Sequence, residues 1–284
     1  MRQKLSVLIP CKDEGHNIRA CIDSVRNIAA EILVADSGST DETLDIVADL
    51  ANSDPKIRII QREYINPSNF KNWAIPQARY PWVMPLDADE RVTDELAEEI
   101  NELLTGTLKD DAYRIPRINY FVGKPIHFSG WQKDAPVRLF RKEECCYDDR
   151  HVHEHLLVPS KNIGRLNCSL LHYTCDSLKE MLEKNIHYSQ LAAQDLQQKG
   201  SKPGFLNLVM RPVLRFLRHY LWKQGFRDGR EGLLLSCLAA NGVFTKYAFL
   251  LALEKDPAIS SALNQNNPEN PPSSIQLPKK ENAA

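Results

Sequence analysis

The stretch Trp82-Val83-Met84-Pro85-Leu86-Asp87-Ala88-Asp89-Glu90 decides how this sequence is interpreted. Its apolar first half is bounded by turn residues and predicts a buried strand. The carboxylates of Asp87 and Asp89 stand one residue apart at the carboxyl end of that strand. Residues i and i+2 of an extended chain share a face, so the two side chains can converge on one object.

Two carboxylates at close range repel each other unless a cation, a proton or a ligand offsets their charge. Oxygen ligands that leave coordination positions open suit a hard divalent ion, Mg²⁺ or Mn²⁺, shared with a diphosphate. A structural alternative exists, because Thr93-Asp94-Glu95 has the pattern of an N-cap and a first helical turn. An isolated Asp-x-Asp does not decide between a metal site and an acidic strand–helix junction.

The segments before this stretch alternate between strand and helix patterns. Strands are predicted at Leu5–Pro10, Glu31–Ala35 and Ile57–Ile60. Helices are predicted at Asn17–Ile28, at Asp41–Ala51 with Ser39 or Thr40 as the cap, and at Asn69–Arg79 with a kink or an early stop at Pro76. This order predicts a parallel sheet with right-handed crossovers. Ligands of such sheets bind outside the carboxyl ends of the strands, where the polar clusters of this sequence also lie.

After a helix predicted at Thr93–Leu104 the pattern changes to shorter strands. One covers Ala112–Val122 and is broken by Pro116, and another covers Pro136–Arg141. The run His151-Val152-His153-Glu154-His155 then places four titratable groups within five residues. Its order and spacing differ from the helical H-E-x-x-H zinc motif. Four such groups together favour a functional site over an exposed polar strand.

Composition describes an ordinary globular chain without a nucleic-acid signature. The 284 residues are 43% apolar and 26% charged, and the formal net charge is −1. The seven cysteines are an odd number without C-x-x-C spacing, which predicts reduced thiols in a cytosolic compartment. Leu5–Pro10 is too short for the apolar region of a signal peptide, and we expect no apolar run of membrane-spanning length.

The C-terminal third combines basic and apolar residues. Arg211, Arg215 and Arg218 recur at helical spacing beside a stripe of Leu, Val, Phe and Trp. This pattern predicts an interfacial helix on an anionic membrane surface, and a core helix with a solvated basic face is the alternative. Leu233–Leu253 is apolar but interrupted, which predicts a buried or membrane-surface helix. We expect a main domain at 1–190, a basic helical extension at 191–256 and a disordered tail at 257–284.

Several segments together resemble the family 2 glycosyltransferases, namely Ser6–Glu14, Val34–Asp41 and Leu86–Glu90. The chain looks most like the bacterial branch that contains the lipopolysaccharide-core beta-1,4-glucosyltransferases, with further similarity at Val137–Arg141, Val152–Glu154 and Leu171–Tyr173. The resemblance covers roughly residues 4–190. It implies an α/β GT-A fold with a mixed, largely parallel sheet, followed by the C-terminal helical extension. It also implies a UDP-sugar donor and inversion at the anomeric carbon.

The same resemblance implies roles for individual residues. By the order of the family's motifs, Glu154 is the expected catalytic base. The charge of the leaving diphosphate independently favours Mg²⁺ or Mn²⁺ on Asp89, with His172 or His153 expected to complete the metal shell or to bind the diphosphate. The expected nucleotide-sugar-binding residues are Pro10, Lys12, Glu14, Asp36, Ser37, Lys71, Asp87, Ala88 and Arg138. The alternative for Lys71 is a solvated helix residue, and for each histidine a structural role is an equal alternative. Two positions depart from the family pattern: many relatives have Asn at Asp13 and Asp at Ser37.

The sequence therefore predicts an inverting glycosyltransferase that moves a hexose, glucose favoured, from a UDP-sugar to a saccharide or lipid-linked acceptor of the cell envelope. We expect it in the cytoplasm, at most peripheral on the inner membrane. A sugar nucleotidyltransferase would also use a parallel sheet and acidic metal ligands, but no glycine-rich phosphate loop follows the first strand. A non-catalytic sugar- or lipid-binding module is the second alternative, and it predicts that Glu154→Gln leaves function intact.

Overall fold

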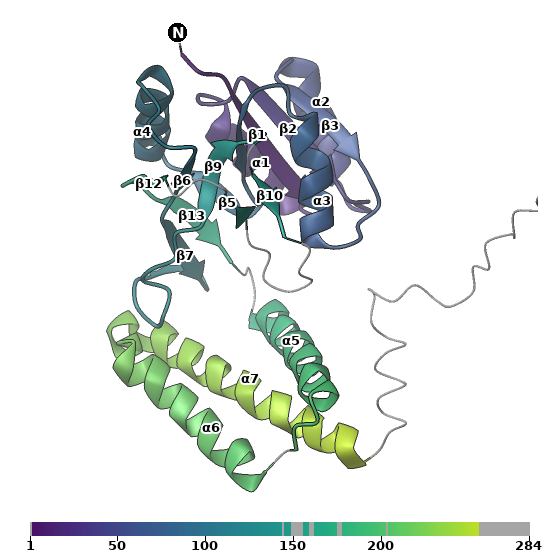
Figure 1. The fold of residues 1–284 in the computed structure, drawn as a ribbon, viewed down its shortest axis with the longest axis vertical. Coiled ribbons are helices and arrows are strands. Elements are labelled where there is room, and N and C mark those ends of the chain that lie inside the picture. Colours follow the sequence, from purple (N-terminus) through teal and green to yellow (C-terminus); the bar gives the residue numbers. More distant parts are fainter. Residues whose placement is uncertain are drawn as a thin grey trace, which may run out of the picture. The chain divides into compact units, whose positions relative to one another are not determined.

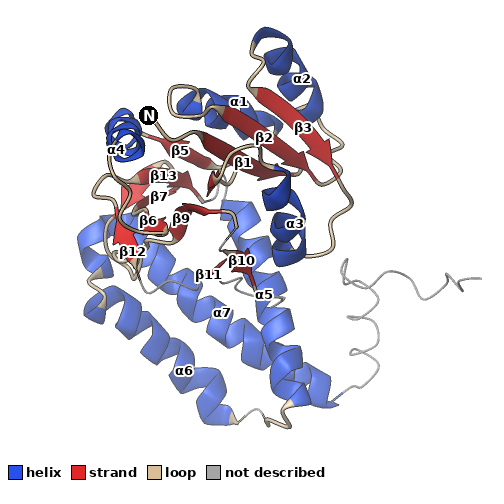
Figure 2. Ribbon diagram, turned by 45° about the horizontal axis from the view of Figure 1, so that its top comes forward, coloured by secondary structure: helices blue, strands red, loops and turns tan. Residues whose placement is uncertain are grey.

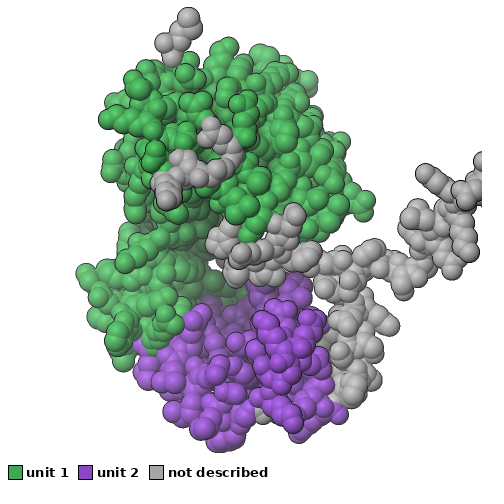
Figure 3. Space-filling view, viewed as in Figure 1, with its two compact units in different colours: residues 1–181, 218–236 green, residues 182–217, 237–284 purple. Residues whose placement is uncertain are grey.

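The structure, a computed structural model, describes residues 2–143, 145–148, 156–158, 162–174, 178–202 and 204–255 (Figure 1). The expected base Glu154, its neighbouring histidines and the predicted tail at 257–284 lie outside these residues. The chain divides into two compact units, shown in different colours in Figure 3. The first unit contains Met1–Met181 and Arg218–Ser236, and the second contains Leu182–Leu217 and Cys237–Ala284. The expected boundary at residue 190 stays a prediction.

A seven-stranded sheet forms the centre of the first unit, in the order β12-β6-β9-β4-β1-β2-β3. Its strands are β1 (Leu5–Cys11), β2 (Glu31–Asp36), β3 (Ile57–Gln61), β4 (Trp82–Pro85), β6 (Ala112–Arg114), β9 (Val137–Arg141) and β12 (Ile163–Arg165). Only β9 runs antiparallel to its neighbours, and the other adjacent strands pair in parallel. The predicted mixed, largely parallel sheet is confirmed.

Alternate residues of the central strands serve two cores, one on each face of the sheet (Figure 2). Val7 and Ile32 pack with α1 (Gly15–Val25), α2 (Thr43–Ser53) and α4 (Asp94–Thr105). Leu8 and Leu33, on the other face, pack with α3 (Pro67–Ala74). Strands that are buried on both faces read as continuous apolar runs, which is why these strands were legible in the sequence.

Prolines set two of the boundaries. The helix predicted at Asn69–Arg79 ends at Ala74, and Pro76 lies in a short 3-10 helix, Ile75–Gln77, because proline cannot donate the next helical hydrogen bond. Pro116 divides the strand predicted at Ala112–Val122 into β6 of the central sheet and β7 (Arg117–Phe121) of a second sheet. That second sheet has the order β5-β13-β7-β8 and includes β5 (Glu90–Val92), β13 (Leu170–Tyr173) and β8 (Lys124–Ile126). A two-stranded sheet joins β10 (Cys146–Tyr147) and β11 (Leu156–Leu157).

The two predicted helix caps have different outcomes. The cap of α4 is confirmed, because the Thr93 hydroxyl accepts a hydrogen bond from the amide of Leu96. The prediction that Ser39 or Thr40 caps α2 is wrong. That helix begins at Thr43 after Glu42, which makes no side-chain cap, and the two hydroxyls are used in the loops described below.

The second unit contains most of α5 (Leu178–Gln198), all of α6 (Phe205–Leu217) and the part of α7 (Gly229–Lys255) from Cys237 onward. Its core contains Ala193, Tyr247, Leu250 and Leu253. A π-helix, Arg218–Trp222, and a 3-10 helix, Gly225–Asp228, lie between α6 and α7 in the chain. Contrary to expectation, the segment Gly225–Lys255 is long and apolar enough to cross a membrane by length and composition. Only 28% of its apolar window is buried inside the structure, and the core helices of soluble proteins that pass the same test are mostly buried.

Candidate functional site

The loops after β1 and β2 are joined by their side chains. The carboxylate of Asp36 accepts hydrogen bonds from the amide of Gly38 at 3.0 Å and from the hydroxyl of Ser39 at 2.5 Å. Asp13, which has a left-handed φ of 54°, donates its amide to the Ser39 hydroxyl and accepts the amide of Thr40 at 2.7 Å. Asp and Asn tolerate this backbone conformation better than most residues. The two loops therefore form one connected rim at the carboxyl end of the sheet.

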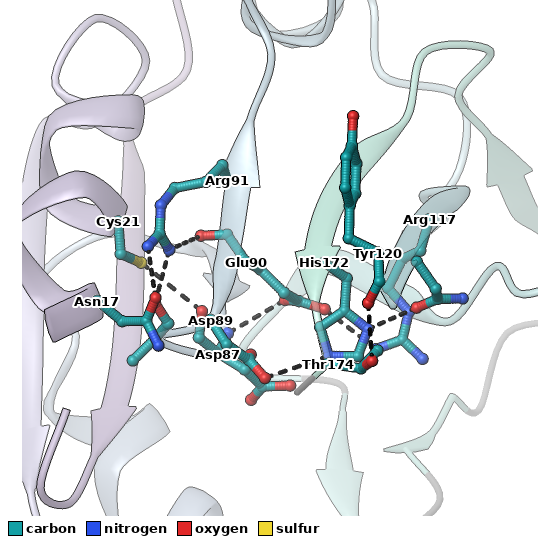
Figure 4. A network of polar contacts seen from close by, with 12 residues as sticks. Asn17, Cys21, Asp87, Asp89, Glu90, Arg91, Arg117, Tyr120, His172 and Thr174 are labelled. Carbon is teal, nitrogen blue, oxygen red and sulfur yellow. Dashed lines mark hydrogen bonds and ion pairs between the residues drawn. The ribbon is translucent and has the colours of Figure 1, made fainter. Parts of the chain in front are cut away.

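Asp87 and Asp89 lie in a turn directly after β4, closed by the amide of Glu90 donating to the carbonyl of Asp87 at 2.9 Å. Arg91 fixes this turn against α1, because its guanidinium donates to the carbonyl of Ala88 at 2.7 Å and to the side chain of Asn17 at 2.8 Å (Figure 4). The carboxylates are thus positioned by a turn and not by the two-residue repeat of a strand. Their side chains are 34% and 27% exposed.

Two cations surround the carboxylate of Asp87. Arg138 Nη2 donates to it at 2.5 Å, and Lys71 Nζ lies 3.4 Å from its other oxygen. Burial by itself would raise the pKa of Asp87, but the charges of Arg138 and Lys71 outweigh burial and hold the pKa well below its usual range. Lys71 is only 7% exposed, so the interpretation as a solvated helix residue is wrong.

Glu90, which follows Asp89 in the chain, connects Asp87 and Arg138 through hydrogen bonds. It is fully buried and accepts hydrogen bonds from Arg138 at 2.8 Å and from Arg117 at 3.0 Å. Its second oxygen accepts the amide of Asp87 at 3.1 Å. The sequence analysis did not single out Glu90 or Arg117. Their signal in the sequence was weak, because only the tertiary structure brings Arg117 from β7 to the turn after β4.

His172 reaches Asp89 through the pairing of β13 with β5, in which His172 stands opposite Glu90. Its Nε2 lies 3.3 Å from Asp89, and its Nδ1 lies 2.6 Å from Oδ1 of Asn119 (Figure 4). The amide nitrogen of Asn119 donates to Asp134 at 3.0 Å. A carboxylate only accepts hydrogen bonds, so this contact assigns the orientation of the Asn119 amide.

The Asn119 oxygen therefore faces Nδ1 of His172, which must carry the hydrogen. Asp134 stays ionised, because burial raises its pKa less than hydrogen bonds from Arg117 and Asn119 lower it. With its hydrogen on Nδ1, a neutral His172 presents a lone pair at Nε2 toward the carboxylate of Asp89. Two electron-rich atoms at this distance require a cation between them, either a proton or a metal ion.

A cavity of about 390 Å³ opens where these groups meet. Predicted residues that line it are Pro10, Lys12, Glu14, Ser37, Lys71, Asp87, Ala88, Asp89 and His172. The structure does not bring Asp36 to the cavity, because its carboxylate is fully buried and occupied by the Ser37–Ser39 loop. It does not bring Arg138 there either, because the guanidinium is directed beneath the turn and lines a neighbouring cavity. Glu154 lies outside the described residues.

Asp89 and His172 present one oxygen and one nitrogen atom that could serve as ligands of a divalent ion. Among the described residues no group of three or more His, Cys, Asp or Glu side chains is arranged to hold a metal ion. An oxygen and a nitrogen donor facing each other fit an ion that takes its other ligands from a bound molecule, and this mixed pair suits Mn²⁺ better than Mg²⁺. The residues present therefore fit a metal shared with a ligand.

Comparison with known proteins gives likenesses over about nine-tenths of the chain. Residues 6–145 match the family described as Glycosyl transferase family 2. The chain is 31% identical to the lipopolysaccharide core biosynthesis glycosyltransferase LpsC of Rhizobium meliloti (strain 1021), over 90% of this chain and 97% of that protein. It is 28% identical to the uncharacterized glycosyltransferase RP128 of Rickettsia prowazekii (strain Madrid E), over 91% of each.

Among solved structures, residues 1–349 of S. aureus TarS in complex with UDP-GlcNAc align with a TM-score of 0.48 at 13% identity, covering 89% of this chain and 91% of that one. The mannosyltransferase PcManGT from Pyrobaculum calidifontis, in complex with GDP-Man and Mn²⁺, aligns with a TM-score of 0.45 at 15% identity. That alignment covers 95% of this chain and 82% of the other.

Proposed function

Because this chain belongs to the family 2 glycosyltransferases, we propose that it transfers a hexose, glucose favoured, from a UDP-sugar to a saccharide or lipid-linked acceptor in cell-envelope glycan synthesis. The observation that carries this proposal is the 390 Å³ cavity at the carboxyl ends of β1, β2 and β4. A cavity at this edge of a parallel sheet is the expected place for a nucleotide. The relation to LpsC, a lipopolysaccharide core glycosyltransferase, supports an envelope glycan as the acceptor.

Within this proposal, the residues that line the cavity divide between the two halves of the donor. Pro10, Lys12, Glu14 and Ser37, on the loops after β1 and β2, would contact the uridine. Asp36 would act indirectly, because its hydrogen bonds hold the loop that presents Ser37. Lys71, Asp87 and Ala88 would lie along the ribose and the diphosphate. The buried Lys71 offers a cation to phosphate oxygens without a large change in its own solvation.

Asp89 and His172 would hold Mn²⁺ or Mg²⁺. Such an ion supplies charge compensation for the diphosphate that leaves. Asn119 would keep the hydrogen of His172 on Nδ1 and so leave Nε2 available to the ion. Metal-bound histidines commonly donate their other ring N–H to such a hydrogen-bond acceptor. In this scheme Arg117 and Asp134 support the metal site by fixing Asn119.

Transfer with inversion needs a base on the acceptor side, and we keep Glu154 as that base. The change Glu154→Gln preserves shape and removes proton acceptance, so turnover should fall about a hundredfold while UDP affinity changes little. An equal loss of UDP affinity would assign Glu154 to the donor site instead. Unchanged turnover would favour the non-catalytic module.

The decisive experiment offers the purified protein a panel of UDP-glucose, UDP-galactose, UDP-N-acetylglucosamine and GDP-mannose with Mn²⁺, and measures release of free nucleotide. UDP-glucose should be hydrolysed slowly, and excess chelator should abolish the reaction. Asp89→Asn should lose this activity, whereas Asp49→Asn, on the outer surface of α2, should keep it. Pyrophosphate release from a nucleoside triphosphate and a sugar phosphate would instead identify a nucleotidyltransferase.

A further inference from the structure

We propose that a second cavity, beside the donor site, binds a negatively charged group on the acceptor, so that the acceptor is an acidic sugar bearing a phosphate or a carboxylate. This inference rests on the proposed function, because it concerns the acceptor of the same transfer. The cavity has a volume of about 650 Å³. Its charged lining residues are Arg114, Arg117, Lys133, Arg138, Asp87 and Asp134.

The charges of this lining do not balance. Four cations face two carboxylates, and both carboxylates are already paired, Asp87 with Arg138 and Asp134 with Arg117. The remaining positive charges are those of Arg114 and Lys133. Lys133 makes no hydrogen bond or ion pair with any residue in the described part of the chain, and Arg114 donates only to the carbonyl of Ala135, at 3.2 Å. The exposed side of the cavity is therefore cationic.

The inner wall adds a buried positive charge. Arg138 is 6% exposed and lines the cavity, and its Nη2 is engaged by Asp87 and Glu90. Its Nε has no hydrogen-bond partner among the described residues, but this atom is itself buried, so Arg138 acts on a bound anion through its charge and not through that atom.

The position of the cavity indicates which substrate it serves. It shares Asp87 and Arg117 with the donor cavity, so a molecule bound there lies next to the donor sugar. A neutral saccharide would leave the charges of Arg114 and Lys133 uncompensated. A phosphate monoester or a carboxylate would satisfy them, and its charge would also favour encounter with the enzyme at low salt.

The test uses the full-length protein loaded with saturating UDP and Mn²⁺, so that the donor site is filled. Calorimetric titration with glucose 6-phosphate, glucuronate and methyl glucoside then compares a phosphate, a carboxylate and a neutral sugar. We expect at least one of the two anionic sugars to bind at least tenfold more tightly than methyl glucoside. Comparing the affinities of glucose 6-phosphate and glucuronate identifies which anion is preferred. Raising the salt concentration should weaken that binding.

Variants locate the bound anion. Lys133→Gln should weaken binding of the preferred anionic sugar about fivefold, and Arg114→Gln combined with it should weaken binding further. Lys133→Arg should retain binding. The matched control is Lys56→Gln, which removes an exposed charge from the turn before β3 and should change nothing.

Three results would overturn the inference: equal affinity for neutral and anionic sugars, displacement of UDP by the anion, or unchanged affinity in the Lys133→Gln and double variants. Displacement of UDP would mean that these cations serve the donor diphosphate. Failure of UDP itself to bind would contradict the proposed function separately. The same titration on UDP-free protein would then still decide whether this cavity holds an anion.

Discussion

The buried carboxylate of Glu90 holds several residues of the site together through its hydrogen bonds. It contacts no cavity, yet it accepts hydrogen bonds from Arg117, Arg138 and the amide of Asp87, and so connects the groups that face the two cavities. Removing one partner from a buried set of charges leaves the others uncompensated, which costs more than the set contributed as a whole.

We therefore predict that Glu90→Gln lowers the free energy of unfolding by about 3 kcal/mol. The neutral amide offers only one acceptor, and it directs two hydrogens at groups that already donate. Glu98→Gln, on the exposed side of α4, is the matched control and should stay within about 0.5 kcal/mol of the wild type. Urea denaturation measures both. A Glu90→Gln protein as stable as the control would show that the arginines are compensated elsewhere.

Asp87 and Asp134 predict how stability depends on pH. Cations and hydrogen bonds hold the pKa of each below its ordinary value, so each folded-state pKa lies below the unfolded one. Their contribution is fully present above the ordinary carboxyl pKa, about 4, and is lost as the pH falls below it. The urea concentration at the unfolding midpoint should thus fall steeply as the pH is lowered below about 4. In Asp134→Asn protein this midpoint should depend less on pH. Asp49→Asn, whose side chain is 77% exposed, should leave the slope unchanged.

At the scale of elements, α6 differs from the alternative of a packed core helix, and its expected role on a membrane surface stays a prediction. None of its residues is buried, and its exposed residues include Leu206, Val213 and Leu217, at 69%, 48% and 41% exposure. Arg211 hydrogen-bonds the hydroxyl of Tyr247, and with Arg215 it lowers the pKa of Lys246 on α7, an effect added to that of burial. The exposed surface of this helix therefore carries both apolar residues and arginines, and the exposed Arg211 also contacts Tyr247 of α7.

This arrangement changes how peripheral membrane attachment is tested. We predict that replacing Leu206, Val213 and Leu217 with serine reduces binding to anionic vesicles at least tenfold, because each side chain would lose apolar area buried in the interface. The fold should persist, since none of the three belongs to the core of the second unit. Leu157→Ser, at 51% exposure in the first unit, is the matched control.

Vesicle co-sedimentation gives the readout. If wild-type protein does not bind anionic vesicles at low salt, the exposed apolar residues of α6 do not serve membrane attachment and another partner covers them. An alkaline wash separates the remaining possibilities, because peripheral protein is released whereas a membrane-spanning α7 would be retained.

For the whole molecule, the expected α/β fold with a mixed, largely parallel sheet is confirmed, and both cavities lie in the first of its two units. A ligand that binds only the folded state stabilises it by mass action. UDP with Mn²⁺ at a hundred times its Kd should add about 2.7 kcal/mol, which raises Tm by several degrees.

Scanning calorimetry checks this prediction. If the two units unfold in separate transitions, only the transition of the first unit should move. UDP with excess chelator should give a much smaller rise than UDP with Mn²⁺, and so should UDP with Mn²⁺ on Asp89→Asn protein. An equal rise of Tm in all three samples would show that UDP binding does not need the metal ion.

The sequence by itself determined the central strands β1, β2, β3, β4 and β9, their order of appearance and the loops that carry polar residues. Strands buried on both faces are continuous apolar runs, and their ends are marked by proline, glycine and acidic residues, so β1, β2 and β4 were legible locally. The family resemblance then supplied the fold and nine of the residues that line the donor cavity.

Only the tertiary structure decided what those residues face. The pairing of β13 with β5 brings His172 to Asp89, and β9 places Arg138 beneath Asp87, over separations in the chain that no local pattern encodes. The same limit applies to α6, where the sequence shows two faces but not which one packs on α7. Side-chain pattern is a local property, whereas pairing and burial depend on distant segments competing for the same surface.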